Sequence, residues 1–204
     1  MSFTGLSELE IDAFTEIINI GMGRAADSLS QMVSEEVSLS VPIVEVIDGK
    51  QAKARLDESG LSSISGVTQR FGGTLNGKAM LLFPEEQSMN LVRLLLKDSV
   101  PLEMMSEMEK EALTEVGNII LNACFGTVAN ALSFDLDSTI PRFINGNSHE
   151  LLENDLSNHA VLMLKVDFSL PSKNIQGFVT FLMDLDSSDI LKESIKTYVA
   201  SYAG

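Results

Sequence analysis

The sequence predicts an α+β fold in which one α-β-β-β-α unit occurs twice, with an antiparallel sheet, long helices and pseudo-two-fold symmetry. Three observations lead to this prediction. Residues recur with a spacing of 99 or 100, long stretches follow the helical period, and paired apolar runs are separated by turn residues. The 204 residues are enough to bury a large core. We therefore expect a single domain, 1–204, built from internal repeats of approximately 1–99 and 100–204.

The repeat is visible in polar and conformationally special residues. A spacing of 99 relates Ser7-x-x-Glu10 to Ser106-x-x-Glu109, Glu16 to Glu115, Asn19 to Asn118, and Pro42 to Pro141. A spacing of 100 relates Gly77 to Gly177, Ser88 to Ser188, and Leu91 to Leu191. One residue inserted in a loop accounts for the step from 99 to 100. Two diverged copies of one unit are the simplest explanation.

The same elements are expected in each half, in the same order. The first half should contain a helix over 7–33, an extended segment around Pro42, strands over 64–71 and 75–83, and a helix over 85–97. The second should contain a helix over 106–133, an extended segment around Pro141, strands over 160–168 and 175–183, and a helix over 187–200. Each long helix begins at an S-x-x-E capping box, and Gly, Asn or Ser residues separate the two strands of each hairpin.

The first long helix has an apolar stripe and an opposite polar face. At about 100° per residue, the stripe is formed by apolar residues that share one side: Phe14, Ile17, Ile18, Ala25, Leu29 and Met32. Asp12, Glu16 and Asn19 lie on the other side, and Gly23 continues the same line. Asparagine is a poor helix former, so its position in the middle of a helix indicates a role beyond helix formation.

The second long helix repeats this arrangement. Its stripe contains Leu113, Val116, Ile120, Cys124 and Ala131. Glu111, Glu115 and Asn118 lie opposite the stripe, and Asn122 stands where the first half has Gly23. Solvated surface residues explain such a face on one helix. Because exposed positions drift most readily, the recurrence of Glu-x-x-Asn at the same phase in both halves favours a functional role.

The two motifs resemble the signature of the CheC/CheX/FliY family of chemotaxis phosphatases, most of all its CheC members. They read Asp12-x3-Glu16-x2-Asn19-x22-Pro42 and Glu111-x3-Glu115-x2-Asn118-x22-Pro141. The resemblance covers essentially the whole chain and includes Asn19-Ile20-Gly21 and the glycines from Phe71 to Gly77. One departure is Glu111, because the family usually has Asp or Ser there.

The resemblance implies a protein phosphatase, a hydrolase that removes phosphate from the aspartate of a phosphorylated CheY-like receiver protein. It implies that Asn19 and Asn118 orient the attacking water, since an amide can both donate and accept hydrogen bonds. Glu16 and Glu115 would pair with the receiver's lysine, Asp12 and Glu111 would be accessory acids, and Pro42 and Pro141 would shape the turn after each helix. No cofactor or metal is expected on this chain, because the receiver domain carries the Mg²⁺.

The composition narrows the possible partners and location. A net charge of −15 argues against nucleic acid and anionic membranes as partners. Cys124 is the single cysteine, so no internal disulfide forms, as expected of a cytoplasmic protein. No signal peptide is recognisable, and no apolar run approaches the roughly 18 residues of a membrane span. Cys124 is interpreted as a core residue.

Other motifs have simpler structural explanations. The G-x-G-x-x-A pattern from Gly21 lies inside a helix, whereas a dinucleotide fingerprint follows a strand, so these glycines indicate close approach of a helix or a partner. The acidic Asp184–Asp189 segment fits a helix cap better than a calcium loop. The two histidines, His149 and His159, match no zinc spacing with Cys124. Most of the ten methionines, including the Met104, Met105 and Met108 cluster, are expected to serve packing.

Two other functional classes remain open. The chain could be a binding module that sequesters a response regulator, or a CheD-like receptor deamidase, without turnover; the second half's later helix, 187–200, is the candidate CheD contact. It could also be a structural adaptor at a flagellar motor switch. The intact Glu and Asn in both halves favour the enzyme. Two internal copies reduce the need for a homodimer, so a monomer is expected.

Overall fold

The structure is a computed structural model that describes residues 6–58, 63–95, 105–147, 150–151, 159–170 and 173–202. The first half contains α1 (Glu8–Val33), β1 (Ser38–Asp48), α2 (Gly49–Glu58), β2 (Ile64–Gly73), β3 (Gly77–Pro84) and α3 (Glu85–Leu95). The second contains α4 (Met105–Leu132), β4 (Leu136–Ser138), β5 (Arg142–Gly146), β6 (His159–Leu170), β7 (Lys173–Asp184) and α6 (Leu185–Tyr202). Among the predicted features, His149, Met104 and residues 96–97 of the helix over 85–97 lie outside the described residues.

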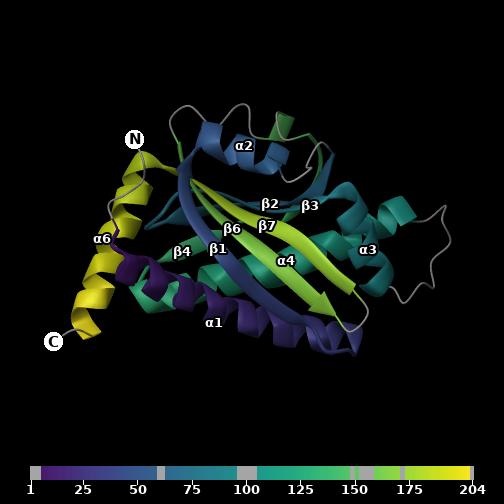
Figure 1. Cartoon of the computed structure of the whole chain (residues 1–204), viewed down its shortest axis with the longest axis horizontal. Helices are drawn as coiled ribbons and strands as arrows, with labels where there is room; N and C mark the ends of the chain where they lie inside the picture. Colours follow the sequence, from purple (N-terminus) through teal and green to yellow (C-terminus); the bar gives the residue numbers. More distant parts are fainter. Residues whose placement is uncertain are drawn as a thin grey trace.

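All the strands belong to one antiparallel sheet with the order β1-β6-β7-β3-β2-β4, and β5 also pairs with β2. Both predicted hairpins, β2–β3 and β6–β7, are present. The outer strands cross between the halves: β1 pairs with β6, whereas β4 and β5 pair with β2 (Figure 1). The expected mixed helical and antiparallel fold is therefore confirmed.

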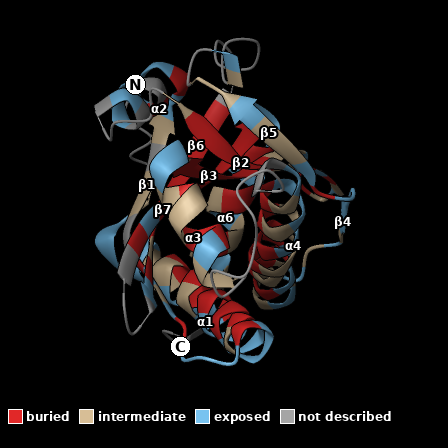
Figure 2. Ribbon diagram, turned by 90° about the vertical axis from the view of Figure 1, so that its right-hand side faces the viewer, coloured by how far each residue is buried: buried red, intermediate tan, exposed pale blue. Residues whose placement is uncertain are grey.

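The sheet is buried on both faces, which explains why its central strands read as continuous apolar runs. Along β3, Leu81 and Phe83 join the large core under α1 and α4, whereas Met80 and Leu82 join a smaller core that includes Ala52 of α2. This is the alternation expected of a strand. Figure 2 shows the buried residues on the sheet and on the inward sides of α1 and α4, with exposed residues outside.

Helix α1 begins and packs as its sequence indicates, with one exception. Ser7 and Glu10 form the predicted capping box, with the Ser7 backbone N–H donating to Glu10 Oε2 at 2.6 Å. The expected core residue Met32 is instead 42% exposed, while Val33 is buried. Gly21, Ala25, Leu29 and Val33 are all buried, and each follows the previous one by four residues. Such an i, i+4 row winds around the helix, so the stripe has moved past Met32 at the last turn.

In the second predicted capping box, Ser106 lies inside the helix and the partner of Glu109 is on another helix. Helix α4 begins at Met105, one residue before the expected first position of the helix, and Glu109 is buried. Its Oε1 accepts a 2.9 Å hydrogen bond from the Ser88 hydroxyl on α3. Glu109 therefore joins two helices, whereas Glu10 caps its own helix. The predicted cap of the last helix is present, because Asp184 Oδ1 accepts from the Ser187 backbone N–H at 2.7 Å.

Helix α2 was not predicted from the sequence, whereas an extended segment was expected around Pro42. Helix α2 covers the sheet face opposite α1 and α4, with Ala52 fully buried (Figure 1). Pro42 lies within β1, where the register with β6 shifts between Ser40 and Ile43. Proline lacks the N–H that a regular ladder requires, and an edge strand with a shifted register tolerates that loss. The extended segment predicted around Pro42 is therefore confirmed, and a role of Pro42 in shaping the turn after α1 stays a prediction.

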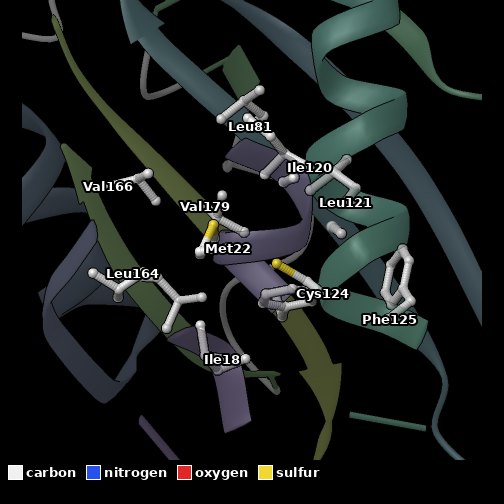
Figure 3. Close-up of a cluster of buried hydrophobic side chains, with 14 of the residues drawn as sticks. Ile18, Met22, Leu81, Ile120, Leu121, Cys124, Phe125, Leu164, Val166 and Val179 are labelled. Carbon is white, nitrogen blue, oxygen red and sulfur yellow. The ribbon is translucent and has the colours of Figure 1, made fainter. Parts of the chain in front are cut away.

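Helix α4 is long and apolar enough to cross a membrane by length and composition alone, over Glu107–Leu132. In the structure, 44% of its most apolar window is buried inside the protein. Its apolar residues meet α1 and the strands, as Figure 3 shows for Ile120, Leu121 and Cys124 beside Met22 and Leu81. The hydropathy of α4 is thus explained by its place in the core.

Cys124 is fully buried in this core, as the sequence predicts, and burial raises the pKa of its thiol from 9.0 to about 12. We expect the folded protein to resist a maleimide at pH 8, because the Cys124 thiol is covered by the core and stays protonated at that pH. In denaturant the thiol is exposed and should react rapidly. Above pH 9, the unfolded thiol loses a proton that the folded thiol keeps, so stability should decrease as pH rises. Rapid labelling of the native protein, followed by mass spectrometry, would contradict this prediction.

Candidate active site

The first motif lies on the outward face of α1, as predicted. Asp12 and Glu16 are exposed and Asn19 is partly exposed. Within the described part of the chain, these three side chains make no hydrogen bond or ion pair. Ile17 and Ile18, which neighbour them in sequence, are buried in the core. The helix therefore holds a carboxylate and an amide in solvent, one turn apart, on a rigid support.

The second motif has the same exposure on α4. Glu111 and Glu115 are exposed, Asn118 is partly exposed, and Val116 beside them is fully buried. Unlike Asn19, however, Asn118 has a partner. Its Oδ1 accepts a hydrogen bond of 2.7 Å from Nδ2 of Asn122, one helical turn later.

Asn122 is in turn held by a buried amide from the sheet. Gln69 of β2 is 2% exposed, and its Nε2 donates to Asn122 Oδ1 at 3.1 Å, to Ser138 Oγ at 3.0 Å and to the Thr139 carbonyl at 2.8 Å. Thr139 itself is fixed to β2, because its N–H donates to the Arg70 carbonyl at 2.9 Å. The second motif thus rests on a hydrogen-bonded network that reaches into the core.

Gln69 is a site residue that the sequence motifs did not reveal. The available signal was a glutamine within the apolar run Ile64–Phe71, since a polar residue in a buried strand needs a hydrogen-bond partner. Its partners come from α4 and from the segment after β4, which are distant in sequence. Only the fold could identify them.

The two prolines occupy different settings, and neither is joined to its Glu and Asn by a described contact. Pro141 is buried between β4 and β5, close in sequence to Ser138 and Thr139. Pro42 is inside β1. The structure therefore brings together Asn118, Asn122, Gln69 and Ser138, and leaves the Glu16 and Asn19 face open.

The motif residues lie on the outward faces of α1 and α4. An internal apolar cavity of about 30 Å³ lies between Phe14, Phe71 and Phe125, and an open hollow of about 340 Å³ lies between the end of α4 and α6. The motif residues line neither. Exposed isoleucines stand near both motifs: Ile20 follows Asn19 and is 46% exposed, and Ile140 follows Thr139 and is 82% exposed. An exposed polar face with exposed apolar neighbours suits a protein partner that supplies its own pocket.

The described residues contain no group of three or more His, Cys, Asp or Glu side chains placed to hold a metal ion. The α1 face offers the amide of Asn19, and the α4 face offers those of Asn118 and Asn122, each beside exposed carboxylates. An amide can orient water through both a donor and an acceptor. A carboxylate can pair with a cationic side chain of a partner.

Close packing sets the position of Asn118. A Cβ added to Gly117 would lie 2.8 Å from Val67 Cγ1 and 2.9 Å from Val67 Cγ2 in β2, so α4 can approach the sheet this closely only with glycine. We expect Gly117→Ala to destabilise the protein by about 1–3 kcal/mol because the core becomes overpacked. Val67→Ala should rescue part of that loss, and the double mutant should cost less than the sum of the single mutants. Chemical denaturation measures all three, and strict additivity would contradict this packing argument.

Sequence comparisons find relatives that are named as CheY-P phosphatases. The CheC-like family model matches residues 9–46, which contain the first Glu-x-x-Asn and Pro42. CheY-P phosphatase CheC of Bacillus subtilis is 24% identical over 144 residues, 68% of each chain. Putative CheY-P phosphatase CheC1 of Halobacterium salinarum is 22% identical over 182 residues, 87% of this chain and 91% of that protein.

Solved structures share the fold at low identity. FliY of Thermotoga maritima aligns with a TM-score of 0.75 and 17% identity, covering 96% of this chain and all of that one. The FliM middle domain of H. pylori aligns with a TM-score of 0.62 and 11% identity, covering 93% and 99%. CheX of Borrelia burgdorferi, solved in complex with CheY-BeF3-Mg²⁺, aligns with a TM-score of 0.50 and 22% identity, covering 79% and 95%.

The FliM match shows that this fold is also present in a protein that is not named as a phosphatase. The fold alone therefore does not identify a phosphatase. The relatives named CheC and the family model that contains Glu16 and Asn19 add sequence information that the fold lacks. This chain therefore resembles the CheC/CheX/FliY family of chemotaxis proteins, in sequence through its CheC-like match and in fold through the FliY and CheX structures.

Proposed function

We propose that this chain is a phosphatase that hydrolyses the phosphoaspartate of a CheY-like response regulator. The observation that carries the proposal is the repeated exposed face of α1 and α4, where Glu16 and Asn19 recur as Glu115 and Asn118 at the same phase. The core uses the opposite side of each helix, so packing does not require these residues. The names of the relatives and the CheX–CheY complex support the same reaction.

The absence of the motif residues from the described cavities suits this substrate. A receiver's phosphorylated aspartate lies in its own pocket, with its own lysine and Mg²⁺. The phosphatase then has to deliver only a side chain that orients water in line with the departing carboxylate oxygen. Asn19 or Asn118 is that side chain, since an uncharged amide brings no negative charge toward the phosphoryl group.

The glutamates fix the docked receiver. Glu16 and Glu115 lie one turn before the asparagines and are exposed, so each carboxylate can pair with the receiver's lysine. Asp12 and Glu111 stand a further turn back and support the approach electrostatically. The exposed Ile20 and Ile140 provide apolar contact with the receiver.

We also infer that the two halves arose by duplication and that the chain acts as a cytoplasmic monomer. The sheet order supports the duplication, since exchanging the halves gives the same order read from the other edge. The non-glycine residues with positive φ in the described chain are Ser34 and Ser133, both at 57°, which occupy equivalent places after α1 and α4. A CheD-like partner would contact α6, where Leu185 and Ile190 are 56% and 42% exposed.

The test is phosphate release from a phosphorylated CheY-like receiver with and without this protein. We expect turnover to be accelerated at substoichiometric amounts of the protein and to require Mg²⁺ in the receiver. Binding to the phosphorylated receiver without acceleration would favour the sequestering module instead. The proposal would be overturned if the protein neither bound any receiver of the source organism nor accelerated its dephosphorylation.

A further inference from the structure

We propose that Asn122 is a positioning residue that fixes the amide of Asn118, with Gln69 as its anchor, and that the second site is therefore the faster of the two. The inference rests on the proposed function. It starts from an asymmetry between the two halves: Asn118 has the Asn122 partner, whereas Gly23 stands at the equivalent place beside Asn19. A glycine has no side chain with which to hold an amide.

The direction of the network is fixed at its buried end. The Thr139 carbonyl can only accept a hydrogen bond, so the group of Gln69 that faces it must be the NH2. A flipped Gln69 would bring its oxygen against that carbonyl and against Asn122 Oδ1. The present orientation leaves Gln69 Oε1 buried without a partner in the described structure. That unfavourable feature persists because the alternative loses more hydrogen bonds.

Orientation then passes outward from one amide to the next. Since Gln69 donates to Asn122 Oδ1, the NH2 of Asn122 faces the other way and donates to Asn118 Oδ1. The NH2 of Asn118 is thereby turned away from Asn122, and one lone pair of Asn118 Oδ1 stays available for water. The second site offers this donor and acceptor in one set orientation, whereas Asn19 is free to rotate.

The anchoring segment is itself rigid. Arg70 N–H donates to Thr139 Oγ1 at 3.1 Å, and Thr139 N–H donates to the Arg70 carbonyl, so the strand after Gln69 and the segment after β4 hold each other. Ser138 Oγ is a second acceptor for Gln69 Nε2. Fixing the side chain before the receiver docks removes the need to order it during the reaction, which raises turnover and leaves binding unchanged.

The kinetic test isolates each site. In an Asn19→Ala background, where the second site alone reports, Asn122→Ala should lower kcat by roughly tenfold with KM unchanged. In an Asn118→Ala background, the same change should leave the first site's kcat unaltered. Asn130→Ala is the matched control, since Asn130 is also an exposed asparagine on α4, and should change neither background. An equal fall in both backgrounds would show a merely structural role and overturn the inference, as would no fall in either.

A second measurement needs no substrate. In the ¹⁵N-labelled protein, NMR relaxation should show the side-chain NH2 of Asn118 rigid and that of Asn19 mobile, and Asn122→Ala should make Asn118 as mobile as Asn19. Equal mobility of Asn19 and Asn118 in the wild type would overturn the inference. A rigid Asn118 in a protein that binds receivers without hydrolysing them would instead overturn the proposed function, so the two failures are distinguishable.

Discussion

Alanine at both Asn19 and Asn118 should abolish the acceleration of receiver dephosphorylation, reducing it by about 100-fold or more, because no side chain would remain to hold the attacking water in line. Each single replacement leaves one working site, so activity should fall in two steps. The larger step should come from Asn118, whose amide is already oriented by Asn122. Initial rates of phosphate release at saturating phosphorylated receiver measure this.

Loss of activity in this double variant cannot be attributed to unfolding. Both asparagines are only partly buried on the outward faces of long helices, and alanine has the higher helix propensity. Circular dichroism and the melting temperature should therefore match or slightly exceed those of the wild type. The Asn130→Ala variant, with its replacement elsewhere on α4, should keep full activity. Full activity in the double variant would show that the amides are not the catalytic groups.

Truncating Phe83 should greatly destabilise the protein, because this side chain lies at the centre of the sheet. Phe83 and Phe168 are both fully buried, with ring centroids 5.3 Å apart, and they join β3 to β6 across β7. Phe83→Ala should lower the free energy of unfolding by about 3–5 kcal/mol, since it removes the buried ring and leaves a cavity. For a chain of this size, the melting temperature should decrease by roughly 6–20 °C.

The surroundings of Phe83 allow little collapse into that cavity. Gly177 of β7 lies against the ring, and a Cβ there would be 2.6 Å from Phe83 Cε1, so the neighbouring strand has no side chain to fill the space. Leu185→Ala on α6 is the matched control, because Leu185 is 56% exposed and its loss should cost less than about 0.5 kcal/mol. Similar effects of the two substitutions on denaturant midpoints would contradict the assigned core.

Local patterns predicted the elements of this fold more successfully than its long-range contacts. The capping box at Ser7 and the apolar stripe determine α1, and the paired apolar runs determine the two hairpins, because the signal for each lies within one element. The predicted burial of Met32 was wrong, because burial at the end of α1 depends on how α1 crosses α4. Helix α2 was missed because its sequence is mostly polar, and among the α2 residues whose burial is described, Ala52 has the one buried side chain.

The candidate site shows the same division. The outward phase of Glu16, Asn19, Glu115 and Asn118 follows from helix geometry and could be predicted. The support of Asn118 by Gln69 could not, because it requires β2, α4 and the segment after β4 to be adjacent in space. Glu109 is a similar case: its sequence context is that of a cap, yet its partner is Ser88 on another helix.

The crossing of the outer strands between the halves has a consequence for biosynthesis. Ser38 of β1 pairs with Ser169 of β6. Strand β1 therefore cannot form this pairing until most of the chain has left the ribosome. Contacts so distant in sequence give a high contact order and slow folding, during which an unpaired strand edge is open to aggregation. Neither half can complete its own sheet during translation, so a nascent chain stalled near its midpoint is a natural client for chaperones.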